Sequence, residues 1–60
     1  MAVAVSVPHV GEYWTDGAHL YYVLHVNETF CKVEDCQTGT LEDIPFQQVQ
    51  QMKMVDRGAK

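Results

Sequence analysis

Positive charge is scarce in this 60-residue chain, which carries four Lys or Arg against eight Asp or Glu, a formal net charge of −4. Binding to a phosphate backbone relies on clustered Lys and Arg, and the only basic pair near a terminus is Arg57 with Lys60. No apolar run approaches the roughly 20 residues of a membrane span. The start, MAVAVSVPHV, lacks the basic region and the long apolar region of a signal peptide. Nucleic acid and membrane are therefore disfavoured as partners, and a cytoplasmic location is expected.

Cysteine is limited to Cys31 and Cys36. In an extended strand their Cα atoms lie about 16 Å apart, whereas those of a disulfide lie within about 7 Å. The odd spacing sends the two side chains to opposite faces, so they cannot both ligate one ion. We expect a fold without metal, cofactor or disulfide, in which Cys31 is a small core residue.

Catalysis is also disfavoured. Cys36, His19 and Asp35 are the residue types of a nucleophile, a base and its orienting acid, but Asp35 alternates to the opposite face from Cys36. A domain this small offers no deep pocket to exclude water, and Cys36 with His19 is only half of a tetrahedral zinc site. The acidic doublets, Glu34-Asp35 and Glu42-Asp43, are interpreted as solvated turn flanks. The prediction is that the protein is not an enzyme.

Strand and turn signals dominate the rest of the chain. Asp16-Gly17, Asn27-Glu28 and Gln37-Thr38-Gly39 are typical of tight connections. The predicted strands are EYWT (12–15), AHLYYVLHV (18–26), TFCKVEDC (29–36), TLEDIP (40–45) and KMV (53–55). FQQVQQM (46–52) is predicted to form one short helical or 3₁₀ turn, with Phe46, Val49 and Met52 on one side. AVAVSV alternates strictly and is either a further strand or a frayed terminus.

Treating the first two connections as two-residue loops predicts which residues share a face. In this register Trp14 faces His19, Leu24 faces Cys31 and His19 faces Cys36. The predicted core face holds Tyr13, Leu20, Tyr22, Leu24, Val26, Cys31 and Val33. The predicted outer face holds Trp14, His19, Tyr21, Val23, His25, Phe30, Lys32, Glu34 and Cys36.

An outer face this rich in aromatic residues is unusual, because sheet faces exposed to water usually carry polar side chains. One explanation is that the sheet curls into a barrel whose far side, or the N-terminal valines, covers these residues. The other is that they form a partner or self-association surface. On the second explanation the predicted partner-binding residues are Trp14, His19, Tyr21, Val23, His25 and Phe30.

The order of elements resembles a small SH3-like barrel, in particular its Tudor and chromo-like variants. The resemblance lies in the hairpin EYWTDGAHLYYVLHV, the strand, turn and strand of CKVEDCQTGTLEDIP, and the turn FQQVQQM before a closing strand. It implies an all-β fold, a five-stranded SH3-like barrel with one short 3₁₀ turn over residues 11–55. Residues 1–10 would be an N-terminal strand or flexible arm, and residues 56–60 a flexible tail.

Such barrels bind peptides, modified side chains or nucleic acid and are not catalytic. Tudor-like domains hold methylated Lys or Arg in aromatic cages, for which Trp14, Tyr21 and Phe30 are candidates by residue type. We expect a non-enzymatic interaction module or small inhibitor or adaptor with a protein partner, and a phage or mobile element would suit as its source. The alternatives are a nucleic-acid-associated barrel using stacking aromatics and a structural homodimer paired through AVAVSV.

Overall fold

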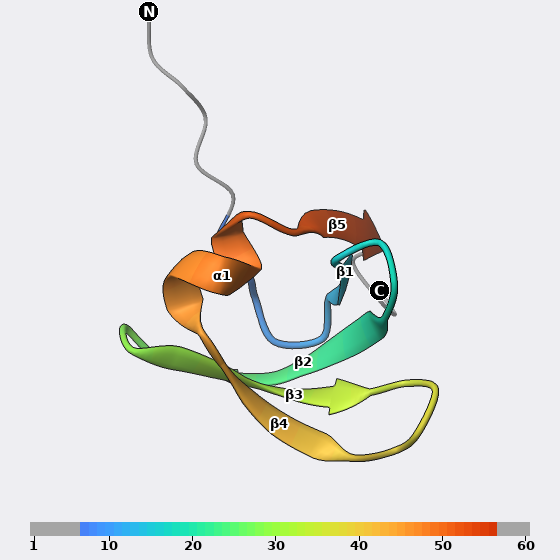
Figure 1. Ribbon diagram of the computed structural model, residues 1–60. Helices are drawn as coiled ribbons and strands as arrows, with labels where there is room; N and C mark the ends of the chain where they lie inside the picture. Colours follow the sequence, from blue (N-terminus) through green and yellow to red (C-terminus); the bar gives the residue numbers. More distant parts are fainter. Residues whose placement is uncertain (1–6, 57–60) are drawn as a thin grey trace, which may run out of the picture.

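Five antiparallel strands and one short helix make up the described part of the chain, residues 7–56, in a computed structural model (Figure 1). In chain order the elements are β1 Tyr13–Thr15, β2 Leu20–Val26, β3 Phe30–Asp35, β4 Leu41–Pro45, α1 Phe46–Gln50 and β5 Lys53–Asp56. The sheet order is β4-β3-β2-β1-β5, which leaves β4 and β5 as its two edges. The predicted all-β class and five strands are confirmed, and the sheet is open.

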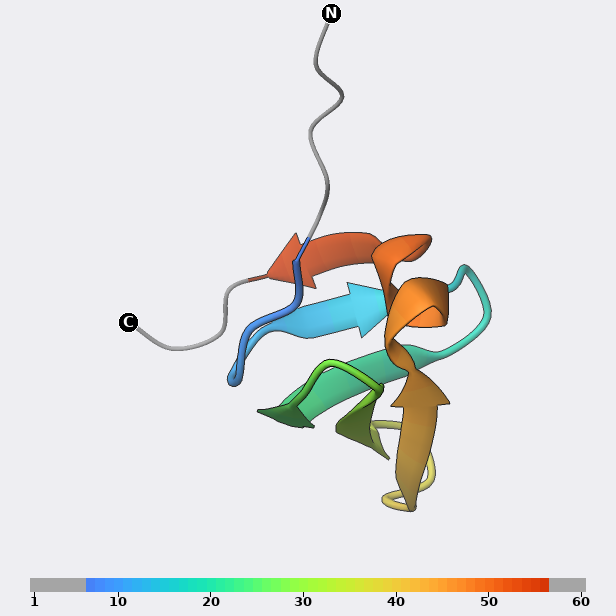
Figure 2. The same cartoon turned by 90° about the vertical axis from the view of Figure 1, so that its left-hand side faces the viewer.

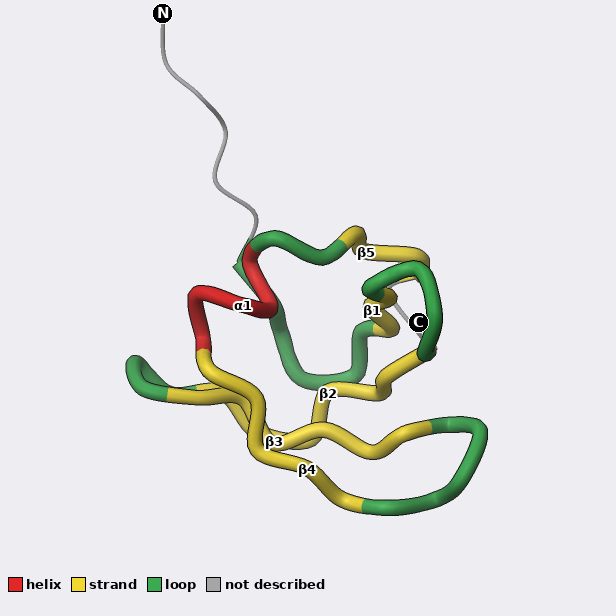
Figure 3. Tube along the Cα trace, in the orientation of Figure 1, coloured by secondary structure: helices red, strands yellow, loops and turns green. Residues whose placement is uncertain are grey.

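The sheet curves so that β1 and β5 lie over β2, β3 and β4, with α1 on one side between the two parts (Figures 1 and 3). We call the inner side of this bend the concave face and the other side the convex face. The core is formed by seven buried side chains, Trp14, Tyr21, Val23, Cys31, Val33, Ile44 and Val49. Four partly buried side chains pack against it, Val26, Phe46, Met52 and Met54.

The connection between β1 and β2 is longer than the predicted two-residue turn. Thr15 pairs with Leu20, so four residues form the loop. A type I′ turn needs positive φ at both central positions, and in residues 7–56 only glycines have positive φ, Gly17 at 98° among them. The Asp16 carboxylate instead accepts N–H bonds from Ala18 and His19, both at 2.8 Å. Moving the register by two residues keeps the same residues on each face of this hairpin.

The pairing of β2 with β3 changes register by one residue, and this reverses the predicted faces. The turn is also one residue later than predicted, since the N–H of Asn27 donates to the carbonyl of Phe30 at 3.1 Å. A bulge between Val23 and His25 then sets Val23, rather than Tyr22, opposite Val33. Because side chains alternate along a strand, one extra residue exchanges the faces beyond it.

The assignment of Cys31 and Val33 to the core is confirmed. The assignment of Tyr13, Leu20 and Tyr22 to the core is wrong, because their neighbours in the strands are buried and they themselves are only half-buried. The positions of the strands were predicted correctly, but the core and outer faces of β1 and of most of β2 were predicted the wrong way round.

The segment 46–50, for which one short helical or 3₁₀ turn was predicted, is an α-helix and not the 3₁₀ turn that the resemblance implies. It begins directly after Pro45, the N-cap residue, whose ring holds φ at −52°. Val49 is buried, and Phe46 and Met52 pack against the core. The prediction that these three apolar residues share one side is confirmed.

Before β1, the chain pairs briefly with β2 outside the assigned strand. The N–H of Gly11 donates to the carbonyl of Val23 at 2.9 Å, and the N–H of Val23 donates to the carbonyl of Glu12 at 3.0 Å. Pro8 is buried, whereas Val7 and Val10 are exposed. Residues 1–6, on which the predicted N-terminal strand falls, lie outside the described residues, as do 57–60. Asp56, the first residue of the predicted tail, belongs to β5.

Candidate functional site

A row of side chains crosses the convex face from β1 to β4. Tyr13 pairs with Tyr22, Tyr22 with Glu34, and Glu34 with Leu41. Each of these four residues alternates with a buried residue of its own strand, so all four side chains point away from the core. The row gives the convex face an aromatic end at β1 and β2 and an aliphatic end at β4.

The two tyrosines form a fixed aromatic pair at one end of this row. Their ring centroids are 4.9 Å apart and their planes are tilted by 54°. Both rings are half-buried, and Leu20 of β2, which pairs with Thr15, lies on the same face. At the other end, Leu41 is 61% exposed. Tilted aromatic pairs contribute about 0.5–1.5 kcal/mol beyond area burial, so the rings form a preorganised apolar surface.

The structure does not bring the predicted partner-binding residues together on one exposed face. Trp14, Tyr21 and Val23 are 2%, 6% and 0% exposed, so the prediction that they form an exposed aromatic surface is wrong. The bend of the open sheet covers them (Figure 1). The other three members of the set are exposed or half-buried, namely His19, His25 and Phe30. The convex tyrosines were missed because they had been assigned to the core.

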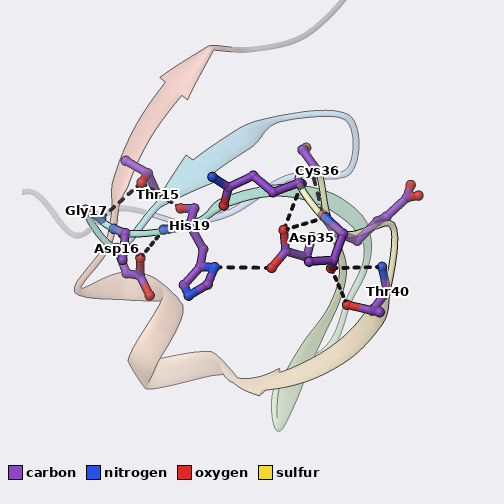
Figure 4. Close-up of polar contacts among 11 residues, drawn as sticks. Thr15, Asp16, Gly17, His19, Asp35, Cys36 and Thr40 are labelled. Atoms are coloured by element: carbon purple, nitrogen blue, oxygen red, sulfur yellow. Dashed lines mark hydrogen bonds and ion pairs between the residues drawn. The ribbon is translucent and has the colours of Figure 1, made fainter.

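A polar cluster around Asp35 joins the β1–β2 loop to the β3–β4 turn (Figure 4). Asp35 is the buried charged side chain of residues 7–56, at 3% exposure. Its Oδ1 accepts the N–H of Gln37 at 2.8 Å and of Thr38 at 3.3 Å, and its Oδ2 lies 3.3 Å from Nδ1 of His19. The interpretation of Asp35 as a solvated turn flank is therefore wrong, because its carboxylate is an internal acceptor for the turn.

Cys36 lies next to this cluster in a setting that does not activate a thiol. Its Sγ is 3.9 Å from the backbone oxygen of Glu34. Partial burial and the negative charges of Glu34 and Asp35 raise the pKa of the Cys36 thiol. A raised pKa leaves little thiolate at neutral pH, and the thiolate is the nucleophile.

The described part of the chain contains no cluster of side chains suited to bind a metal ion. Both cysteines are free thiols, Cys31 buried and Cys36 exposed. Across residues 7–56, no group of three or more His, Cys, Asp or Glu side chains is arranged to hold a metal ion.

Glu12 holds a second set of polar contacts, at the start of β1. Its Oε1 accepts the backbone N–H of His9 at 2.8 Å and Nε1 of Trp14 at 3.0 Å, and its Oε2 lies 3.4 Å from Nδ1 of His9. Burial by itself raises the pKa of Glu12, but the hydrogen bonds and the charge of His9 outweigh it and lower the pKa overall. The ionised carboxylate thus helps to hold the buried indole in place.

We expect Glu12→Gln to weaken the dependence of stability on acid pH. Because folding lowers the Glu12 pKa from its ordinary value of 4.5, its contribution is present above that value and is lost as pH falls through the folded-state pKa. Urea unfolding at a series of pH values from neutral to acid should show a smaller loss in Glu12→Gln than in the parent protein. The pKa of Asp16 is also lowered, by the N–H groups of Ala18 and His19. Because Asp16 is present in both proteins, some loss of stability at acid pH is expected in Glu12→Gln as well.

The control is Glu28→Gln, because Glu28 is an exposed carboxylate in the β2–β3 turn. If Glu28→Gln and Glu12→Gln change the pH dependence equally, the contacts of Glu12 do not stabilise its ionised form.

Compared with known proteins, the chain matches no family model, and no curated protein or solved structure is significantly similar to it. No helix within residues 7–56 is long and apolar enough to cross a membrane. The convex face and the Asp35 cluster are the features of the molecule from which a function can be inferred.

Proposed function

We propose that this protein is a non-enzymatic interaction module, acting as a small inhibitor or adaptor, that binds a protein partner through the convex face of its sheet. The observation that carries the proposal is the Tyr13–Tyr22 pair, which lies on the face opposite the buried core. Leu20 lies on the same face as the pair, and the exposed Leu41 is a further apolar side chain on this face, beyond Glu34 in the row.

The convex tyrosines are not needed to complete the core. Seven buried side chains on the concave side and α1 already form one connected cluster. A sheet face turned toward water is usually polar, whereas Tyr is enriched in protein interfaces because its ring is large and its hydroxyl tolerates water. An aromatic pair on the second face therefore favours a contact surface.

An SH3-like barrel of the Tudor or chromo-like type is part of this proposal. It is supported by the antiparallel pairing of β5 with β1 and by the single helical turn between β4 and β5. The chain's two free thiols suit a reducing compartment such as the cytoplasm. The raised pKa of the Cys36 thiol supports a non-catalytic role.

The test compares Tyr22→Ser with Val10→Ser. Val10 is 63% exposed and lies outside the strands, so its replacement removes exposed apolar surface outside the sheet. Proteins captured from lysate of the source organism would be identified by mass spectrometry, and the affinity of the purified partner would be measured for each variant. We expect Tyr22→Ser to weaken binding about tenfold or more, as for an interface aromatic, and Val10→Ser to leave it unchanged.

Equal affinities for Tyr22→Ser and the parent protein would contradict the proposal. Capture of nucleic acid instead of protein would favour the nucleic-acid-associated alternative, and concentration-dependent dimers in sedimentation that Tyr22→Ser leaves intact would favour the homodimer paired through AVAVSV. Urea unfolding of each variant verifies that the compared proteins are folded.

A further inference from the structure

The two edges of the sheet differ in how well they could accept another strand. β4 pairs with β3 in one continuous register over all five of its residues. β5 is shorter, and its register with β1 shifts between Tyr13 and Trp14. A regular edge is a better template for an added strand than an interrupted one. In Figure 2, β4 lies at the border of the sheet with its free side turned away from β3.

The hydrogen bonds at the two ends of β4 show which backbone groups face outward. The N–H of Asp35 donates to the carbonyl of Thr40 at 2.8 Å, and the N–H of Phe46 donates to the carbonyl of Thr29 at 3.1 Å. Bonded and non-bonded pairs alternate in an antiparallel ladder, so Glu42 and Ile44 direct their backbone groups to β3.

Leu41 and Asp43 consequently direct their backbone groups to the free side of β4. Leu41 and Asp43 each offer an N–H and a carbonyl there, whereas the carbonyl of Pro45, the N-cap residue of α1, accepts the first bond of the helix. Pro45 costs the β3 ladder nothing, because its missing N–H would face outward. Four of the five β4 residues are exposed, and β3 is the only strand that pairs with β4 in the part of the chain that the structure describes.

The side chains around this edge are mainly acidic. Glu42 and Asp43 of β4 are exposed, and Glu34 of β3 pairs with Leu41. Lys32 is the one nearby cation of β3 and β4, with its Nζ 3.1 Å from Oδ1 of Asp43. The edge therefore keeps an excess of negative charge.

From this edge and its charge we infer that β4 takes an extended, basic segment of the protein partner as a sixth strand. This inference deepens the proposed function, on which it rests, by naming the chemistry of the partner. Backbone bonds to Leu41 and Asp43 would supply affinity. Lys or Arg side chains of the segment would meet Glu42, and apolar ones on its other side would continue the convex row beyond Leu41.

A second copy of this chain is a poorer occupant of the same edge. Two antiparallel β4 strands would bring Glu42 and Asp43 of each copy close to those of the other. Like charges facing one another across strands are destabilising, and charged edges are a common protection against self-pairing. The acidic edge thus opposes self-association and favours a basic partner.

The experiment titrates the ¹⁵N-labelled protein with a short peptide in which Lys and Val alternate, and separately with the matched Glu and Val peptide. We expect saturable amide shifts and slowed hydrogen exchange at Leu41 and Asp43 with the Lys peptide alone. Leu41→Pro removes one outward donor and no ladder bond, so it should weaken this binding about three- to tenfold, the effect of one hydrogen bond. Leu41→Val, which keeps the N–H, is the matched control.

Equal binding of the two peptides, shifts confined to other strands, equal affinities for Leu41→Pro and Leu41→Val, or an absence of saturable shifts would overturn the inference. Tyr22→Ser separates it from the proposed function. If Tyr22→Ser leaves partner affinity unchanged while the Lys peptide still binds at β4, the convex-face proposal fails and the β4 edge stands as a binding site. If instead Tyr22→Ser weakens partner binding and the Lys peptide does not bind at β4, the convex face is the contact surface and no strand is added.

Discussion

Replacing Tyr21 by Ala should leave the protein largely unfolded, whereas replacing the adjacent Tyr22 by Ala should leave it folded. Tyr21 is 6% exposed on the concave face, while Tyr22 is half-buried on the convex face. Truncating a buried aromatic residue costs about 3–5 kcal/mol. A domain of this size rarely has more than about 3–5 kcal/mol of stability in total. The two variants delete the same side chain from neighbouring positions and so form a matched pair.

Urea unfolding followed by circular dichroism measures both free energies. Because Tyr21→Ala lacks a folded baseline if it is fully unfolded, Tyr21→Leu and Tyr22→Leu extend the comparison with milder changes. We expect Tyr21→Leu to be the more destabilising of the two. If Tyr22 variants lose as much stability as Tyr21 variants, the convex pair belongs to the core and is no free contact surface.

The positions of the strands could be predicted from the sequence. The apolar and β-branched runs lie between turn residues, and each predicted strand overlaps an observed strand with its ends shifted by at most two residues. Val49 in α1 was also predictable, since it continues an apolar side with Phe46 and Met52. These features depend on local pattern alone.

The orientation of β1 and β2 could not be predicted in this way. Asp16-Gly17 and Asn27-Glu28 suggested two-residue loops, but the side chains of Asp16 and Asn27 each accept two N–H bonds and stabilise different turns. The bulge near Leu24 carries no Gly or other sequence signal. A single extra residue was enough to place Tyr13 and Tyr22 on the wrong face.

The same error affects the predicted partner-binding residues, because they were taken from the face that the register placed outside. Trp14 and Tyr21 alternate with Tyr13 and Tyr22, so both sets look equally suited to a core. What distinguishes them is the curvature of the sheet and the position of α1, which close over the concave side. Asp35 was missed for a similar reason, since only the fold shows that the β3–β4 turn wraps around its carboxylate.

Asp35 is expected to be the polar side chain whose loss costs the most stability. Asp35→Ala leaves the N–H groups of Gln37 and Thr38 without their acceptor and removes the contact with His19. The loss of several hydrogen bonds to a buried carboxylate should lower the free energy of unfolding by about 2–3 kcal/mol. Asp35→Asn keeps an oxygen that can accept the turn bonds, so a smaller loss is expected.

Asp43→Ala is the control, because its ion pair with Lys32 is exposed on both sides and pairs of this kind contribute about 0–1 kcal/mol. Urea unfolding near neutral pH should rank the losses as Asp35→Ala, then Asp35→Asn, then Asp43→Ala. Amide exchange at Gln37 and Thr38 should rise in Asp35→Ala and stay low in Asp35→Asn, which separates loss of the turn acceptor from loss of charge. If Asp35→Asn is as damaging as Asp35→Ala, the charge facing His19 outweighs the turn bonds. If neither is more damaging than Asp43→Ala, the cluster does not stabilise the junction of the two loops.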